Sequence, residues 1–199
     1  MFNICSIVIG ILGSLLSAIS LALFLKEKKK NKTIYWRDIP IAMNYLSEKM
    51  KKDFIPEIIL IPNEKGGVLA NFLKKSLPYN AVCIFGIGMP KKRANIDDTY
   101  YVSNDFINFS TAKWDAYLPK CLFEYRDKKL LILDDFTMTG DFLEKLKDTL
   151  TNTVGFNDDN IRSMCLATTI FAKENNKEPD YYWKIFETPK VFLPWGKPE

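Results

Sequence analysis

The stretch that decides the fold is Leu-Leu-Ile-Leu-Asp-Asp-Phe-Thr-Met-Thr-Gly, residues 130–140. An apolar run with the length of a buried strand leads directly into two adjacent acids, Asp134 and Asp135. A Thr-Gly pair, Thr139 and Gly140, follows shortly afterwards, and the next residues predict a helix. Carboxylates at the end of a strand accept hydrogen bonds from sugar hydroxyls, and the amides of a helix N-terminus bind phosphate. This stretch can therefore hold a sugar phosphate.

Strands and helices alternate on both sides of this stretch. Apolar runs predict strands at residues 57–61, 81–87, 129–134 and 161–172. Helical spacing of apolar residues predicts helices at 38–52, 68–76 and 141–150. Residues 63–67 predict a turn, and the polar residues 88–113 predict a mobile loop with short strands such as 99–103. Because each strand is a continuous apolar run, we expect an α/β fold with a parallel sheet covered on both faces.

The composition excludes several kinds of catalytic site. The chain of 199 residues has no histidine, which excludes serine–histidine and cysteine–histidine catalysis and histidine metal sites. Much of the net charge of +4 lies in residues 26–32, so we predict no nucleic-acid partner. The cysteines are scattered without a Cys-x-x-Cys pair, which favours reduced structural thiols over disulfides or zinc: Cys5, Cys83, Cys121 and Cys165.

The N-terminal segment has the properties of a membrane anchor. Residues 4–25 contain no charged side chain, and a helix of that length crosses a hydrocarbon core of roughly 30 Å. A cleaved signal peptide is the alternative, although no basic residue precedes the apolar run. The basic residues that follow place the C-terminal domain in the cytoplasm by the positive-inside rule. We therefore expect a single transmembrane anchor (1–25), a basic juxtamembrane linker (26–36) and one soluble domain (37–199).

Small residues recur every four positions along this anchor and form one stripe: Ser6, Gly10, Ser14, Ala18 and Ala22. Such a stripe lets two membrane helices approach closely, so pairing of two chains through the anchor is one interpretation. Chance recurrence is the other, because these residue types are common in membrane helices. We expect a homodimer.

Three stretches resemble the type I phosphoribosyltransferases. Residues 130–140 are similar to the family's motif for phosphoribosyl pyrophosphate (PRPP), in which four hydrophobic residues, two acids and a Thr-Gly pair follow one another. Residues 65–67, Lys-Gly-Gly, resemble the family's pyrophosphate loop. The aromatic, proline-bearing segments 179–182 and 191–195 resemble the C-terminal hood of purine-type members. The order of these stretches is more specific than any one of them.

The resemblance implies a central parallel sheet flanked by helices, with the hood over the site. It implies transfer of a 5-phosphoribosyl group from PRPP to a nitrogen base, with Mg²⁺ bound to the diphosphate. The catalytic acids Asp134 and Asp135 would hold the ribose hydroxyls, directly or through Mg²⁺ and water. The implied 5-phosphate loop and pyrophosphate loop consist of Thr137, Met138, Thr139, Gly140 and Asp141, and of Lys65, Gly66 and Gly67.

One basic residue among Lys91, Lys92 and Arg93 could also close over the diphosphate, although a solvated basic turn is the alternative for all three.

Three positions in or beside the PRPP motif depart from the family. Met138 stands where purine-salvage members carry an Asp that acts as acid or base. Asp141 and Phe142 stand where a Gly and a hydroxyl residue are usual. These departures favour a changed acceptor, or a site that binds nucleotide without turnover. The alternatives to an enzyme are therefore a PRPP or nucleotide sensor that regulates a membrane complex, and a membrane-tethered defence effector.

Overall fold

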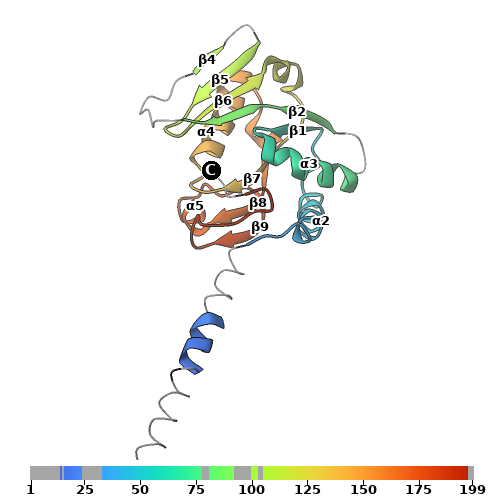
Figure 1. The fold of residues 1–199 in the computed structure, drawn as a ribbon. Helices are drawn as coiled ribbons and strands as arrows, with labels where there is room; N and C mark the ends of the chain where they lie inside the picture. The colour runs from blue at the N-terminus through green and yellow to red at the C-terminus, as the bar shows by residue number, and fades with distance from the viewer. Residues whose placement is uncertain are drawn as a thin grey trace, which may run out of the picture.

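A five-stranded parallel sheet forms the centre of the molecule. The computed structural model describes residue 14 and the ranges 16–23, 33–77, 81–91, 100–102 and 105–196. Within these residues the central strands lie in the order β2-β1-β7-β8-β9, and each neighbouring pair is parallel (Figure 1). The strands are β1 (Ile58–Ile61), β2 (Val82–Phe85), β7 (Leu130–Thr137), β8 (Ile161–Thr169) and β9 (Tyr181–Phe186). The predicted α/β fold with a central parallel sheet is confirmed.

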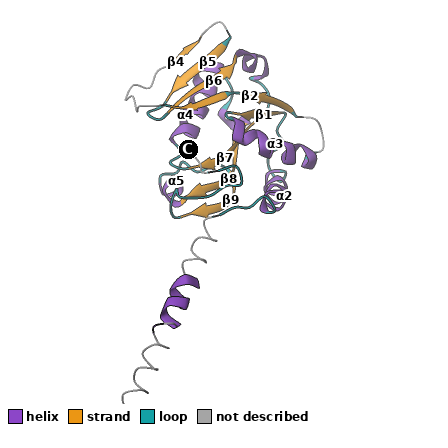
Figure 2. Ribbon diagram, viewed as in Figure 1, coloured by secondary structure: helices purple, strands orange, loops and turns teal. Residues whose placement is uncertain are grey.

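Helices cover both faces of this sheet (Figure 2). The helices are α2 (Asp38–Met50), α3 (Glu64–Ser76), α4 (Asp141–Thr149) and α5 (Ile170–Glu174). A π-helical turn (Leu150–Val154) extends α4, and two 3₁₀ helices span Lys120–Tyr125 and Asp158–Asn160.

Alternate residues of the central strands feed two separate hydrophobic cores. Ile59 and Ile61 of β1 join the core formed with α2 and α3. Ile58 and Leu60 of the same strand join the core formed with α4 and the second sheet. Because successive side chains of a strand point to opposite faces, an unbroken apolar run is what a sheet covered on both faces requires.

A second sheet replaces the predicted mobile loop at 88–113. Its strands are β3 (Ile87–Pro90), β4 (Tyr100–Val102), β5 (Phe106–Ser110) and β6 (Trp114–Pro119). They pair antiparallel in the order β3-β6-β5-β4, above the central sheet in Figure 1. The short strand predicted at 99–103 is confirmed by β4, whereas the mobile loop was wrong because the described residues of this segment pair with one another in a sheet. Residues 92–99, which include Lys92 and Arg93, lie outside the described residues.

Three element boundaries also differ from the prediction. Strand β7 continues through the two acids to Thr137, because Phe136 and Thr137 still pair with β8. The strand predicted at 161–172 ends at Thr169, whose side chain accepts a hydrogen bond from Ala172 N and starts α5. Residues 63–67 form the beginning of α3 and not a turn.

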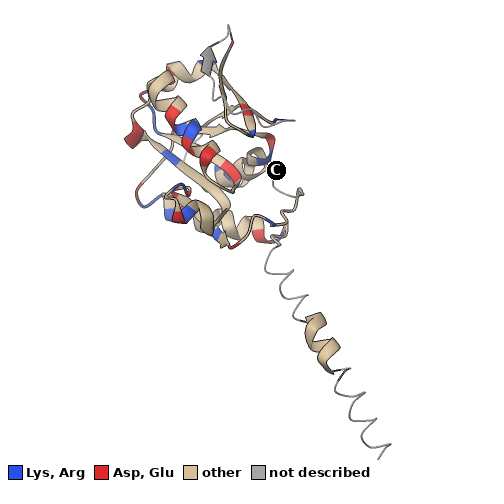
Figure 3. Cartoon of the chain, turned by 90° about the vertical axis from the view of Figure 1, so that its left-hand side faces the viewer, with Lys and Arg blue, Asp and Glu red and all other residues tan. Residues whose placement is uncertain are grey.

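The N-terminal segment is described only at residues 14 and 16–23, which are helical. Within the described residues, no helix is long and apolar enough to cross a membrane. The expected anchor at 4–25 lies largely outside the described residues, as does most of the basic linker. In the domain that follows, the positions of acidic and basic residues are interspersed along the chain (Figure 3).

Candidate functional site

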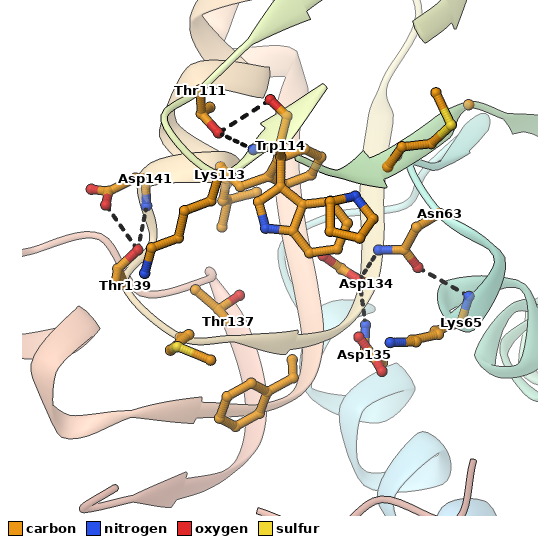
Figure 4. A pocket seen from close by; sticks show the side chains of 18 of the residues that line it. Asn63, Lys65, Thr111, Lys113, Trp114, Asp134, Asp135, Thr137, Thr139 and Asp141 are labelled. Atoms are coloured by element: carbon orange, nitrogen blue, oxygen red, sulfur yellow. Dashed lines mark hydrogen bonds between the residues drawn. The ribbon is translucent and has the colours of Figure 1, made fainter. Parts of the chain in front are cut away.

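The two acids lie in the middle strand of the central sheet, and hydrogen bonds orient each of them. The Oδ1 atom of Asp134 accepts from Asn63 Nδ2 at 2.8 Å and from the backbone N of Asp135 at 2.7 Å (Figure 4). The Oδ2 atom of Asp135 accepts from Trp195 Nε1 at 2.7 Å. Asp134 is half-buried, whereas Asp135 is only 5% exposed. One oxygen of each carboxylate is therefore fixed by a hydrogen bond from a neighbouring residue.

Burial makes both acids weaker than ordinary aspartates. Removal from water raises the pKa of Asp134, although the hydrogen bond from Asn63 opposes this. Burial and then the neighbouring charge of Asp134 raise the pKa of Asp135 to about 7, against the hydrogen bond from Trp195. The charge of Lys65 lowers the pKa of both acids. A buried pair of acids next to a lysine suits a ligand that brings hydroxyl groups or a cation.

The residues of the predicted pyrophosphate loop form the first turn of α3. Asn63 caps this helix, and its Oδ1 accepts from the backbone N of Lys65 at 3.0 Å and of Gly66 at 3.1 Å. A Cβ atom on Gly66 would lie 2.4 Å from the carbonyl oxygen of Leu133, so a side chain there would force α3 away from β7.

Asn63 is therefore a candidate site residue that the sequence did not single out. Its oxygen fixes the start of α3 and its nitrogen fixes Asp134, so it ties the helix terminus to the acid. An Asn before a predicted helix is a common capping signal and could have marked it. The predicted turn at this place concealed that signal.

The predicted 5-phosphate loop runs from the end of β7 into α4. Gly140 has φ +83°, a left-handed conformation that favours glycine. Thr139 Oγ1 donates to Asp141 Oδ2 at 2.9 Å. Thr137 Oγ1 lies 3.0 Å from the buried Cys165 Sγ, and the carbonyl oxygen of Met138 accepts from Thr169. The turn therefore lies at the N-terminus of α4, a nine-residue helix whose first amides carry partial positive charge.

Lys177 neutralises the unexpected acid at the start of α4. Its Nζ lies 2.8 Å from Asp141 Oδ1 and 2.7 Å from Glu144 Oε2. These contacts raise the pKa of Lys177, and the bond from Lys177 lowers the pKa of Asp141. No local sequence pattern marks Lys177 as a partner of Asp141, because the two residues are 36 positions apart along the chain.

One cavity of about 870 Å³ brings most of the predicted site residues together. Lys65, the acid pair and all five residues of the 5-phosphate loop line it, whereas Gly66 and Gly67 do not (Figure 4). The opposite wall comes from the second sheet and includes Lys91, Lys113 and Trp114. Phe142 packs between the two parts, 5.6 Å from the ring of Phe109 and 5.8 Å from that of Trp114.

Lys91, the one described member of the predicted basic trio, is already paired. Its Nζ lies 3.5 Å from Asp115 Oδ1, and its side chain is only 9% exposed. This contact fixes the end of β3 against β6. Lys91 lines the cavity as a buried wall residue and not as part of a solvated turn.

The predicted hood is divided between two structures. Tyr181 and Tyr182 belong to β9, at the edge of the central sheet, because Tyr181 pairs with Met164 of β8. The last described residues, 191–196, turn back toward the acids and place Trp195 on Asp135. Only this second part therefore reaches the acid pair.

A magnesium ion fits this site only together with a substrate. Within the described residues, no three His, Cys, Asp or Glu side chains are grouped to hold a metal. Mg²⁺ commonly binds through one or two carboxylates together with substrate phosphates and water. The two carboxylates of Asp134 and Asp135, which both lie in the C-terminal half of β7, match that partial donor set.

Similarity to solved structures defines the fold as that of the purine phosphoribosyltransferases. A purine phosphoribosyltransferase from Pyrococcus horikoshii superposes with a TM-score of 0.55 and 21% identity, over 84% of this chain and 95% of that one. The xanthine-guanine-hypoxanthine phosphoribosyltransferase of Helicobacter pylori superposes with a TM-score of 0.54 and 16% identity, over 82% and 92%.

A hypothetical protein from Neisseria gonorrhoeae, solved with bound ppGpp, has a TM-score of 0.54 and 17% identity, over 82% of this chain and 89% of that one. No protein-family model and no curated protein matches the sequence. The chain therefore shares the fold of these proteins at low sequence identity.

Proposed function

We propose that this protein binds PRPP and transfers its 5-phosphoribosyl group to a nitrogen base. The observation that carries the proposal is the single cavity lined by the acid pair, the turn before α4 and Lys65 at the start of α3. These groups suit the hydroxyls, the 5-phosphate and the diphosphate of PRPP, in that order. The shared fold of the purine phosphoribosyltransferases supports the same assignment.

The residues supply positioning and charge in this scheme. Asp134 and Asp135 accept from the ribose hydroxyls, and the amides of residues 137–141 hold the 5-phosphate. Lys65 faces the diphosphate, whose negative charge grows as it leaves. Bound Mg²⁺ would neutralise that diphosphate, with the acid pair as the protein's contribution to holding it.

The base receives no proton transfer from position 138, because Met138 has no acid or base group. We therefore propose an acceptor nitrogen that reacts without help from that position. An oxocarbenium-like transition state needs orientation and electrostatic stabilisation more than a nucleophile, which agrees with the lack of histidine in the chain.

Calorimetry of PRPP binding in the presence of Mg²⁺ tests the proposal. The full chain should bind PRPP, and Asp134→Asn/Asp135→Asn should weaken binding at least about 100-fold, because two hydrogen-bonded carboxylates are lost. Asp158→Asn/Asp159→Asn is the matched control, since it changes an adjacent, exposed acid pair in a 3₁₀ helix outside the cavity. Equal affinity in all three proteins would refute the assignment, and pyrophosphate release with a panel of bases follows from a positive result.

A nucleotide sensor is the second candidate function. The observation in its favour is Met138, which lines the cavity, together with the fold shared with a protein solved with bound ppGpp. A sensor would bind PRPP or a guanine nucleotide in competition with each other and would release no pyrophosphate with any base. Pyrophosphate release that depends on an added base would exclude this candidate.

We also propose that residues 4–25 anchor the protein in a membrane, with the domain in the cytoplasm, and that the chain forms a homodimer. The uncharged run and the basic residues after it support the orientation. Fractionation and protease protection of the full chain test the anchor and its direction. Gly10→Leu should weaken pairing in a membrane reporter assay, and Leu12→Ala, which leaves the small-residue stripe intact, should not.

A further inference from the structure

Trp195 links the C-terminal segment to the more buried of the two acids. Its indole Nε1 donates to Asp135 Oδ2 at 2.7 Å, across 60 residues of sequence. An indole nitrogen only donates, so this contact fixes a carboxylate oxygen as its acceptor. Hydrogen bonds to a charged partner are stronger than neutral ones, and they restrict the side chain to one rotamer. The second oxygen of Asp135 is thereby left in a fixed direction.

Trp195 is in turn held by the residues that enter the domain. Its ring lies edge-on to that of Trp36, with centroids 5.7 Å apart. Beside this contact, Ile34 N donates to Phe192 O at 2.8 Å, and Thr33 forms a parallel bridge with Phe192. We call residues 33–36 and 191–196 together the clasp.

The clasp is anchored firmly in the core. Ile34, Val191 and Leu193 are at most 5% exposed and pack in the same hydrophobic cluster as Leu133. Reciprocal backbone bonds of 3.0 Å between Leu193 and Gly196 close a tight turn around Trp195. The indole is therefore presented from a fixed backbone.

We propose that Trp195 is a positioning residue for Asp135, and that Trp36 keeps Trp195 in place. The junction between the N-terminal segment and the domain is then coupled to the acid that meets the ribose. The part of this inference that concerns ribose rests on the proposed function, whereas the contact itself does not. Trp195 does not line the cavity, so it acts through Asp135.

The contact is tested first without any ligand. Nitrogen-15 labelling of the tryptophan side chains in the full chain gives one indole signal for each of the four tryptophans, and Trp195→Phe identifies that of Trp195. A charge-assisted bond should move this proton signal downfield, and Asp135→Asn, which weakens the acceptor, should return it upfield. Trp36→Leu should also shift the signal. An unchanged chemical shift of the Trp195 signal in both Asp135→Asn and Trp36→Leu would overturn the proposal.

The positioning role is tested by PRPP affinity with Mg²⁺. Trp195→Phe keeps a smaller aromatic ring but removes the donor, so PRPP binding should weaken roughly tenfold. Trp183→Phe is the matched control, because Trp183 also packs against this core but lies in β9 and faces Lys184. Its affinity should stay within about twofold of the wild type.

The outcomes separate the two ideas. Wild-type affinity in Trp195→Phe, at an unchanged melting temperature, would overturn the positioning role. An equal loss of PRPP affinity in Trp195→Phe and Trp183→Phe would show that Trp195 contributes only packing, and it would overturn the positioning role as well. If the wild-type protein binds no PRPP, the proposed function fails, and the indole signals alone decide whether Trp195 orients Asp135.

Discussion

The two sheets of this molecule divide the work of building the cavity. The central sheet is parallel and buried on both faces, and it delivers the acids through β7 and the turn at residues 138–140 that follows. The second sheet is antiparallel and supplies a wall that contains Lys91, Lys113 and Trp114. The first sheet thus fixes which charged groups meet a ligand, and the second limits the shape of what fits between them.

The chain passes from the central sheet to the second sheet through one residue and returns through the 3₁₀ helix Lys120–Tyr125. Strands β2 and β3 are separated only by Gly86, whose backbone N still donates to Ile61 O of the central sheet at 2.8 Å. A Cβ atom on Gly86 would lie 3.1 Å from the carbonyl oxygen of Tyr117 in β6. The relative placement of the two sheets therefore depends on a small residue at this point.

The largest expected effect is on the central sheet. Gly66→Ala should lower the free energy of unfolding by about 3 kcal/mol, because the new methyl group meets the backbone of Leu133. Gly67→Ala is the matched control, since its Cβ would meet only the ring of Phe85, at 3.2 Å. Urea denaturation measures both. Alanine has the higher helix propensity at both positions, so a similar result in the two variants would show that close packing on β7 does not decide the outcome.

The acid pair should make stability depend on pH. The pKa of Asp135 is about 7 in the folded protein and ordinary, 3.8, when exposed, so folding favours the protonated form. The ionisation of Asp135 therefore does not change the free energy of unfolding at a pH below 3.8. It lowers that free energy increasingly as the pH rises toward 7. From pH 5 to pH 8, the wild type should lose about 2.5 kcal/mol relative to Asp135→Asn in urea denaturation. Parallel pH profiles of the two proteins would contradict the raised pKa.

The contact of Phe142 in α4 with the second sheet should not tolerate the hydroxyl residue that is usual at this position in the phosphoribosyltransferases. Phe142→Ser restores a hydroxyl group but removes the ring that packs against Phe109 and Trp114. We expect a loss of about 1.5 kcal/mol in stability, with PRPP affinity retained if the hydroxyl meets the 5-phosphate. Phe171→Ser, at a position that is 57% exposed, is the control and should cost little. An unchanged melting temperature in Phe142→Ser would mean that α4 does not hold the second sheet.

The smallest expected effect concerns the ion pairs at the start of α4. Lys177→Gln leaves Asp141 and Glu144 without this partner, next to the proposed 5-phosphate loop at residues 137–141. PRPP affinity should fall roughly two- to fivefold, because exposed ion pairs are weak and screened. The affinity should also depend less on salt than in the wild type. Lys173→Gln in the exposed part of α5 is the control. If Asp141→Asn in the Lys177→Gln background does not recover affinity, the charge of Asp141 is not the cause.

The sequence predicted the central sheet because its signals are local. The apolar runs of β1 and β7 are unbroken, since both faces of these strands are buried. The acids and the turn at residues 138–140 lie within one short stretch of the chain, so a single motif describes them. The predicted turn at residues 63–67 was wrong because two glycines suggested a loop, while Asn63 starts a helix there.

The remaining features depend on contacts that no local pattern encodes. Asn63 meets Asp134 across 71 residues, and Trp195 meets Asp135 across 60. The strands of the second sheet are short and mixed in polarity; β5, for example, is Phe-Ile-Asn-Phe-Ser. Their identity follows from pairing with one another, because β-strand preference depends on the neighbouring strand more than on the residues alone.

The pairing of Thr33 with Phe192 has a consequence for the way this chain can be rearranged. It brings the entry and the exit of the domain side by side, so a few glycines could join residue 196 to residue 33. New ends could then be opened at the exposed turn around Asp127, between the 3₁₀ helix and β7. Such a circular permutant would retain both sheets. The same domain could also be inserted into a surface loop of another protein, because it needs only one point of attachment.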